Sequence, residues 1–265
     1  MKPLIVIPAR YASTRFPGKP LVDIGGVPML RRTADIARRV GDYVIATDDA
    51  RIEDFCAEQG LPVVMTDPAL PSGSDRAKAA ADLFDPSADV IVNLQGDAPF
   101  TPPAYVKACL GALTRDPNAD IATPVVALSW AALDELRDAK GDTPFSGTCA
   151  IVGEDGRARW FSKNIVPAIR KEVAMRSESE RSPVRQHVGL YAYRRDALNR
   201  YVTLPPSPYE QLEGLEQLRA LENGMIITCA QVDSHPMSQA GIDTPEDVAR
   251  AEAKLAALPS GSPAT

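Results

Sequence analysis

Short apolar runs alternate with segments of helical periodicity along the first half of the chain. Each run ends in polar or turn-forming residues, as buried strands usually do. The runs predict strands at Leu4–Ile7, Tyr43–Ala46, Pro62–Met65, Val90–Leu94 and Asp120–Val126. Because strands alternate with helices, the pattern predicts βαβ units, and therefore an α/β fold with a mostly parallel, Rossmann-like sheet flanked by helices.

The pattern changes in the second half of the chain. Thr148–Val152 and Ala158–Ser162 have the composition of two short strands. The residues between them, Glu154-Asp155-Gly156-Arg157, suit a hairpin turn with Asp-Gly at its centre. His187–Tyr193 predicts a further strand. A hairpin implies antiparallel pairing, so this half predicts a smaller α+β lobe.

We expect this lobe to be an insertion in the α/β core. Its predicted bounds are 127–225, and the core then comprises 1–126 and 226–257. The last residues, 258–265, combine turn formers with little apolar content, and we expect this tail to be disordered.

The segment after residue 206 has the signals of one continuous helix. Ser207 is a favourable N-cap, Glu210 would close a capping box, and Gly224 would end the helix. The periodicity predicts one buried face and one opposite face, formed respectively by Leu212, Leu215 and Leu218 and by Glu210, Glu213 and Gln217.

The loop 8–20, which follows the first predicted strand, is rich in cations. Arg10, Arg15 and Lys19 place three permanent positive charges within ten residues, and Ser13 adds a hydroxyl. Several prolines prevent a helix here. The alternative is an ordinary solvated surface loop. Because the chain as a whole is acidic, the cluster is a local exception, and a small polyphosphate suits it better.

Composition excludes several classes of partner. The 265 residues carry a formal net charge of -6, so the chain lacks the broad basic face that nucleic acids bind. No apolar run approaches the roughly 18 residues of a membrane span, and we expect no membrane association and a cytoplasmic location. Cys56, Cys109, Cys149 and Cys229 lack metal-ligand spacing, which favours reduced thiols over disulfides or zinc.

The segment Gln95–Asp97 follows the very apolar run Val90–Leu94. In sheets of this kind, ligands bind beyond the carboxyl ends of the strands. That rule predicts the segment and the loop 8–20 at one rim, where Gly96 would let a ligand approach the backbone.

Two carboxylates are candidates for holding Mg²⁺ at this rim. Asp97 is expected opposite the loop 8–20, and Asp243 lies just before the last predicted helix. Mg²⁺ usually takes one or two carboxylates together with phosphate oxygens and water. The alternative for each is a helix cap: Asp97 for the next helix, and Asp243, in competition with Thr244, for the last one.

Six motifs occur in an order that resembles one known family. They are Pro8-Ala-Arg-x-x-Ser-x-Arg-x-Pro-Gly-Lys-Pro20, Ser72-Gly-Ser-Asp-Arg76, Asn93-x-Gln-Gly-Asp97, Arg185-x-His187-x-Gly189-x-Tyr191, Glu210-x-x-Glu213-x-x-Glu216-Gln217-Leu-Arg219 and Gly241-x-Asp243-Thr-Pro-Glu-Asp247. Together they resemble the 3-deoxy-manno-octulosonate (Kdo) cytidylyltransferases, or CMP-Kdo synthetases, over roughly residues 3–254. The resemblance implies a nucleotidyltransferase that binds nucleotide in its core, and sugar in an inserted lobe that also forms a homodimer.

The same resemblance implies which residues bind CTP. The triphosphate would be held by Arg10, Ser13, Arg15 and Lys19. The cytosine and ribose would be framed by Ser72, Gly73, Ser74 and Arg76.

The sugar and metal sites implied by the resemblance use other positions. The sugar acid would be lined by Gln95, His187, Tyr191, Glu210 and Gln217. Mg²⁺ would bind Asp97 and Asp243, which with Lys19 would form the catalytic group. His187 could equally be a satisfied histidine on a lobe strand, and Glu210 could serve its capping box as well.

The implied reaction needs no covalent enzyme intermediate. The anomeric hydroxyl of a 2-ulosonic acid would attack the α-phosphorus of CTP, and pyrophosphate would leave. Charge builds on phosphoryl oxygens, so positioning and electrostatics supply most of the rate. Mg²⁺ would lower the pKa of the attacking hydroxyl.

Two segments depart from the family pattern. Asp97 is followed by Ala98 and Pro99, where the family usually has Glu-Pro, and the segment 144–152 lacks a lysine that the family carries. Both changes fall on the expected sugar side. The acceptor could therefore be Kdo or a different or amino-modified ulosonic or nonulosonic acid. The product could serve lipopolysaccharide or capsule synthesis.

A homologue that binds nucleotide but has little activity, and acts as a regulatory subunit, is a further alternative. The pair Asp97 and Asp243 argues against it, because a binding module has little need for two metal carboxylates.

Overall fold

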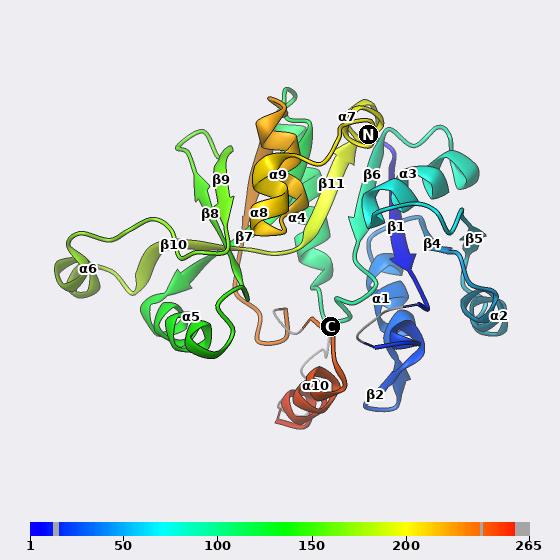
Figure 1. Ribbon diagram of the computed structural model, residues 1–265, viewed down its shortest axis with the longest axis horizontal. Coiled ribbons are helices and arrows are strands. Elements are labelled where there is room, and N and C mark those ends of the chain that lie inside the picture. The colour runs from blue at the N-terminus through cyan, green and yellow to red at the C-terminus, as the bar shows by residue number, and fades with distance from the viewer. Residues whose placement is uncertain (13–15, 239–240, 258–265) are drawn as a thin grey trace. The chain divides into compact units, whose positions relative to one another are not determined.

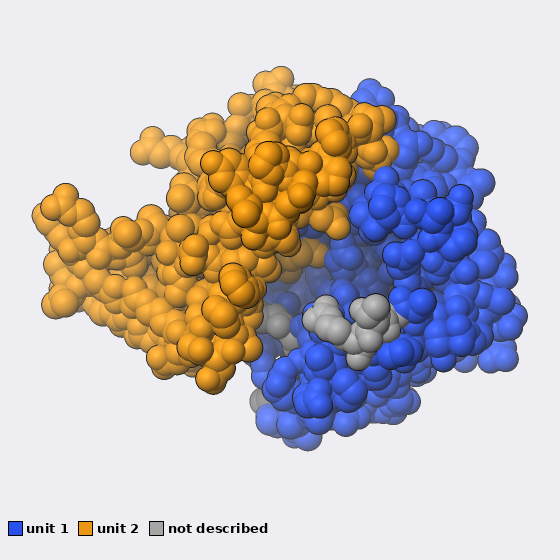
Figure 2. Space-filling model, viewed as in Figure 1, with its two compact units in different colours: residues 1–107, 190–199, 235–265 blue, residues 108–189, 200–234 orange. Residues whose placement is uncertain are grey.

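The computed structural model describes residues 1–12, 16–238 and 241–257 (Figure 1). The chain divides into two compact units (Figure 2). Unit 1 comprises Met1–Lys107, Leu190–Asn199 and His235–Thr265, and unit 2 comprises Ala108–Gly189 and Arg200–Ser234. Ser13, Arg15 and the tail 258–265, for which the sequence made predictions, lie outside the described residues.

Unit 1 contains the mostly parallel sheet that the apolar runs predict. Its spatial order is β5 (Val63–Met65), β4 (Tyr43–Thr47), β1 (Pro3–Ala9), β6 (Val90–Leu94) and β11 (Leu190–Arg194). The first four strands are parallel, and β11 is antiparallel to β6. The predicted α/β fold is confirmed, and the predicted strand at Val90–Leu94 has the same bounds as β6.

Helices and short elements complete unit 1. The longer helices are α1 (Met29–Arg38), α2 (Ala50–Gln59), α3 (Gly73–Phe84) and α10 (Pro245–Ala257). Two more, α4 (Pro103–Arg115) and α7 (Arg195–Tyr201), continue into unit 2. The loop after β1 contains η1 (Lys19–Leu21), β2 (Asp23–Ile24) and β3 (Val27–Pro28).

Parallel pairing brings the carboxyl ends of β1, β4 and β6 to one edge of this sheet. Ala9 at the end of β1 pairs with Thr47 at the end of β4, and Val6 pairs with Asn93 near the end of β6. The loops that follow these strands therefore share a rim, as the sequence predicted.

A buried apolar cluster beside this rim joins the end of the chain to its beginning. It consists of Ile24, Met29, Phe100, Met237, Ile242 and Ala251. The backbone N–H of Ile242 also donates to the carbonyl of Asp97 at 3.0 Å. These contacts fix Asp243 next to Asp97, although the two residues are far apart in sequence.

Unit 2 has a mixed sheet. Its order is β12 (Ile227–Val232), β7 (Ile121–Ser129), β10 (Arg181–His187), β8 (Thr148–Val152) and β9 (Ala158–Ser162). Only β12 and β7 pair in parallel here; the other neighbours are antiparallel. The helices that lie within unit 2 are α5 (Trp130–Asp142), α6 (Glu172–Glu178), α8 (Pro208–Glu213) and α9 (Glu216–Glu222).

The division into units falls at different residues from the predicted bounds 127–225 for the lobe. The strands β7 and β12 belong to unit 2, whereas β11 belongs to unit 1 because it pairs with β6. The segment His187–Tyr193 is not one strand, as predicted, but the end of β10 followed by β11, with Gly189 between them. Strand composition alone does not reveal which strands a segment pairs with.

The prediction of one continuous helix from Ser207 to Gly224 is also wrong, because this segment forms two helices. Gly214 adopts a left-handed conformation (φ 63°) and ends α8, and α9 begins at Glu216. The break turns Leu212 outward, to 80% exposure, while Leu218 is fully buried. A glycine tolerates this conformation at no steric cost, so it ends the helix six residues after its start.

The expectations about the cysteines and about membrane spans can be compared with the structure. All four cysteines are free thiols, and three of them are buried. Within the described ranges, no helix has both the length and the apolar character that a membrane crossing requires.

Candidate active site

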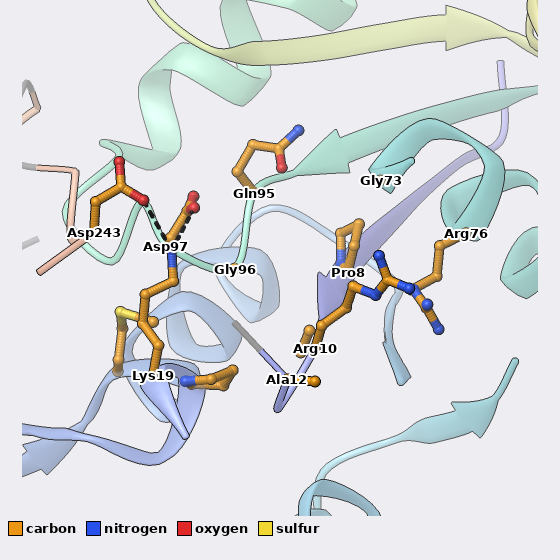
Figure 3. A pocket seen from close by; sticks show the side chains of 13 residues that line it. Pro8, Arg10, Ala12, Lys19, Gly73, Arg76, Gln95, Gly96, Asp97 and Asp243 are labelled. Atoms are coloured by element: carbon orange, nitrogen blue, oxygen red, sulfur yellow. Dashed lines mark hydrogen bonds and ion pairs between the residues drawn. The ribbon is translucent and has the colours of Figure 1, made fainter. Parts of the chain in front are cut away.

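A pocket of about 480 Å³ opens at the rim of the sheet in unit 1 (Figure 3). Its lining consists of Pro8, Ala9, Arg10, Ala12, Lys19, Pro20, Met29, Gly73, Arg76, Gln95, Gly96, Asp97 and Asp243. Seven of these are predicted site residues, drawn from four separate stretches of sequence. The volume lies within the range typical of small-molecule sites.

Lys19 joins the two candidate metal carboxylates. Its Nζ lies 2.9 Å from Oδ2 of Asp97 and 3.2 Å from Oδ1 of Asp243 (Figure 3). The lysine side chain is 13% exposed, and the two aspartates are 43% and 46% exposed. The three side chains form a charged cluster in which the carboxylates reach solvent and the ammonium lies beneath them.

The alternative roles of both aspartates as helix caps are not supported. At the start of α10 the hydroxyl of Thr244 accepts the backbone N–H of Asp247 at 3.3 Å, and the Asp247 carboxylate accepts the N–H of Thr244 at 2.8 Å. Thr244 is therefore the cap, and the Asp243 carboxylate turns to Lys19. Asp97 lies six residues before Pro103, where α4 begins, too far to cap that helix.

Two arginines of the pocket share one carboxylate. Nε of Arg10 lies 3.3 Å from Oδ2 of Asp48, and Nη2 of Arg76 lies 2.8 Å from the same oxygen. Arg76 is 1% exposed and also donates to the hydroxyl of Thr66. Burial lowers the pKa of the Arg76 guanidinium, and the Asp48 carboxylate partly offsets this. Arg10 donates a further bond to the carbonyl of Pro68, at 3.0 Å.

The start of α3 contributes only part of the residues predicted there. Ser72 is the N-cap, and its hydroxyl accepts the backbone N–H of Asp75. Gly73 lines the pocket, where it lies against Gln95 and Asn93. Ser74 is fully buried, within 3.4 Å of the Asn93 amide. Neither serine lines the pocket, so their predicted roles beside cytosine and ribose stay predictions.

Tyr191 lies in β11 of unit 1 and is 7% exposed. It pairs with Asn93 of β6, and its ring lies 6.0 Å from that of Tyr193. It does not line the pocket described above. Its predicted contact with a sugar stays a prediction.

His187 lies in unit 2, at the end of β10. Its Nε2 is 2.8 Å from the hydroxyl of Thr123, and its ring packs edge-on against Phe161 at 5.0 Å. Burial, with a smaller contribution from the Lys163 ammonium, lowers the pKa of His187 to about 3. The imidazole is therefore neutral at physiological pH, and it can accept or donate a hydrogen bond without carrying charge.

This low pKa predicts a loss of stability in acid. An unfolded histidine binds a proton below about pH 6.5, whereas folded His187 resists it until about pH 3. The free energy of unfolding therefore falls as pH drops from 6.5, by up to ~1.4 kcal/mol per pH unit. Urea unfolding at pH 7.5 and 5 should show wild type losing about 2 kcal/mol more than His187→Gln. Equal losses would contradict the assignment.

Glu210 and Gln217 occupy the paired helices α8 and α9 of unit 2. The Glu210 carboxylate accepts the Ser207 N–H at 2.9 Å and Nε of Arg219 at 2.8 Å, and the residue is 8% exposed. The predicted capping box is thus confirmed. Gln217 is 4% exposed. Their roles in binding a sugar stay predictions.

Comparisons with known proteins agree with the geometry. A family model described as cytidylyltransferase matches residues 4–227. The chain is 44% identical over 260 residues to the 3-deoxy-manno-octulosonate cytidylyltransferase of Maricaulis maris, covering 97% of this chain and 98% of that one. The chain belongs to this family. It is a nucleotidyltransferase.

Further relatives place this cytidylyltransferase in the same group. The 3-deoxy-manno-octulosonate cytidylyltransferase of Paramagnetospirillum magneticum is 42% identical over 268 residues, covering 97% and 99% of the two chains. A solved CMP:2-keto-3-deoxy-manno-octonic acid synthetase complexed with CTP superposes with a TM-score of 0.82 at 36% identity, covering 97% and 99%. A cytidylyltransferase from Leptospira borgpetersenii, at 17% identity and a TM-score of 0.61, shares the fold.

Sequence reasoning missed two charged residues of this cytidylyltransferase. Asp48 lies directly after β4, just as Asp97 lies shortly after β6. Its position after a buried strand was the sequence signal that could have identified it. Lys163 follows β9, and its backbone is held on both sides: its N–H donates to Glu213 at 2.7 Å, and its carbonyl accepts from Lys140 at 2.6 Å. No local sequence signal marks Lys163.

Proposed function

We propose that this enzyme transfers the cytidylyl group of CTP to the anomeric hydroxyl of 3-deoxy-manno-octulosonate and releases pyrophosphate. The observation that carries the proposal is the pocket of unit 1, where Lys19 lies between Asp97 and Asp243 and two arginines share Asp48. The high identity to named Kdo cytidylyltransferases supports the acceptor. Since CTP belongs to the intracellular nucleotide pool, we place the reaction in the cytoplasm.

The residues of the pocket suit a phosphoryl-transfer reaction that works by positioning. Arg10 and Lys19, together with Ser13 and Arg15, would hold the triphosphate and stabilise the charge that develops on pyrophosphate as it leaves. Arg76 would hold the nucleoside end together with Gly73, whose missing side chain leaves room beside Gln95.

The donor set also fits Mg²⁺. Asp97 and Asp243 converge on one cation, the ammonium of Lys19; both line the pocket, and both are more than 40% exposed. The described residues contain no cluster of three or more potential metal ligands, and a site of two carboxylates completed by phosphate oxygens and water is usual for Mg²⁺. Asp97 and Asp243 would hold the ion, which when bound supplies a Lewis acid for phosphoryl oxygens.

For the sugar acid, we propose Gln95, Tyr191, His187, Glu210 and Gln217 as the binding residues. Gln95 lines the pocket, and neutral His187 suits a hydroxyl partner. Glu210 is already bonded to Ser207 and Arg219, so it would act mainly by fixing α8.

The function is tested by measuring pyrophosphate release. We expect release with CTP and Kdo in the presence of Mg²⁺, and its loss when the metal is chelated by EDTA. UTP and ATP serve as nucleotide controls and should give little product. CTP binding without release with any ulosonic acid would contradict the proposal.

A second candidate acceptor is an amino-modified ulosonic acid or a nonulosonic acid. The observation behind it is that Ala98 replaces a family carboxylate and that the 144–152 segment lacks the family lysine. In the structure, Lys140 of α5 bonds the carbonyls of Pro144 and Gly147, both at 3.3 Å, and so orders this segment. The same assay with these acids in place of Kdo decides between the acceptors.

We further propose a homodimer formed through unit 2. Unit 2 exposes large apolar side chains on β8 and α8: Ile151 (36% exposed), Tyr209 (51%) and Leu212 (80%). Trp160 of the edge strand β9 pairs with Ile151 and contacts the Tyr209 ring edge-on at 5.1 Å, so it joins Ile151 to Tyr209. A contiguous apolar surface of this kind suits a second copy of the chain, and light scattering of the purified protein tests it.

A further inference from the structure

The carboxylate of Asp48 occupies a particular place in the fold. Parallel pairing sets Ala9 opposite Thr47, so the next residues of the two strands, Arg10 and Asp48, leave the sheet side by side. The Asp48 side chain is only 12% exposed. It therefore lies at the rim of the pocket without being open to bulk solvent.

Both guanidiniums that line the pocket meet at this one carboxylate. Arg76 reaches it from α3, at 2.8 Å, and Arg10 reaches it from the loop after β1, at 3.3 Å. Two cations held on one anion leave a net positive charge for a ligand. The shared anion also reduces the repulsion between the guanidiniums, which would otherwise drive the more mobile one, Arg10, away.

The two arginines differ in how much they depend on Asp48. Arg76 is nearly fully buried and has a second partner in Thr66, so its position is fixed from two sides. Arg10 is 46% exposed, and its other described contact is the carbonyl of Pro68. Without Asp48, a long and half-exposed side chain would sample many rotamers, and binding a ligand would cost the entropy of fixing it.

We propose that Asp48 is a positioning residue of the nucleotide pocket, which holds Arg10 and Arg76 together as prearranged donors to CTP. The inference rests on the proposed function, because it takes CTP to be the ligand of this pocket. Asp48 touches no reacting atom in this arrangement. Its effect should therefore appear in the affinity for CTP more than in the turnover of the bound substrates.

The test is calorimetric CTP binding and steady-state kinetics of Asp48→Asn. We expect CTP to bind about tenfold more weakly, as for loss of a charge-assisted contact, with KM for CTP rising in parallel. The kcat should change less than about threefold. Asp48→Glu, which keeps the charge, should restore most of the affinity.

Two further variants separate positioning from folding. Thr66→Val removes the other partner of Arg76 but leaves Arg10 alone, so it should lower thermal stability without the full tenfold loss of CTP affinity. In an Arg10→Ala background, Asp48→Asn should weaken CTP binding much less than in wild type, because Arg10, the donor that Asp48 positions, is already absent. Arg10 is half exposed, so its removal should leave the fold intact.

These experiments distinguish a failure of the role proposed for Asp48 from a failure of the proposed function. If wild type does not bind CTP, the function is wrong, whatever Asp48 does. If wild type binds CTP but Asp48→Asn binds it equally well, or the losses from Asp48→Asn and Arg10→Ala add fully, then Asp48 does not position Arg10. A Thr66→Val variant that reproduces the whole loss would show that Asp48 acts only by stabilising Arg76.

Discussion

Replacing Lys19 with alanine should reduce pyrophosphate release from CTP by about 10³-fold, the loss expected for a buried charge that stabilises a transition state. In the structure, the Lys19 ammonium holds both Asp97 and Asp243, at 2.9 and 3.2 Å. Without it, the cation that we propose to face the departing pyrophosphate is lost. The two carboxylates would also repel each other and any phosphate between them.

The stability of this variant should change far less than its activity. Asp97 and Asp243 are both close to half exposed, so water solvates them once the lysine is gone, and we expect a loss of about 1 kcal/mol or less in the free energy of unfolding. The matched control is Lys78→Ala, which breaks an ion pair with Asp82 on the exposed side of α3 and should keep full activity. A Lys19→Ala enzyme within tenfold of wild type would exclude Lys19 from catalysis.

The sequence predicted the rim of the sheet well, for a simple physical reason. Apolar runs mark buried strands, and in a parallel sheet the loops after those strands meet at one edge. Arg10, Lys19 and Asp97 follow two such strands, so their proximity could be expected before any coordinates. Asp243 could be named from the sequence only as a candidate, because its place beside Asp97 depends on the long-range bond from Ile242 to the Asp97 carbonyl.

What the sequence could not predict depends on long-range pairing. The segment His187–Tyr193 has strand composition throughout, but its first half pairs with β8 and its second half pairs with β6. Likewise, Asp48 gains its two arginines only when β4 lies beside β1 and α3 packs over them. Neither arrangement leaves a periodic signal in the residues concerned.

Local signals can also conflict. The helix after Ser207 has an N-cap, a capping box and a favourable periodicity through Leu218, and these favoured one continuous element. Gly214 is not a decisive stop signal in the sequence, because an isolated glycine is tolerated inside helices at a modest cost. The structure shows it in the left-handed conformation, with its N–H bonded to the Glu210 carbonyl at 2.7 Å.

Gly96 is the position where a single methyl group should do the most damage to the rim. A Cβ placed there would lie 2.5 Å from the carbonyl oxygen of Pro8, well inside contact distance. That oxygen belongs to β1, which is paired on both sides, with β4 and with β6. Neither backbone can move without shifting the strand ends that carry Arg10 and Asp97.

We therefore expect Gly96→Ala to lower the free energy of unfolding by about 2 kcal/mol through overpacking, as measured by urea unfolding. Activity should fall further, by about 10²-fold, because displacement of the loops by a fraction of an ångström would separate the cations from the phosphates that we propose they hold. Gly41→Ala is the control: a Cβ at residue 41 meets nothing within 4 Å, and its backbone is not left-handed. If both variants keep wild-type stability and activity, the close approach of Gly96 to Pro8 does not constrain the site.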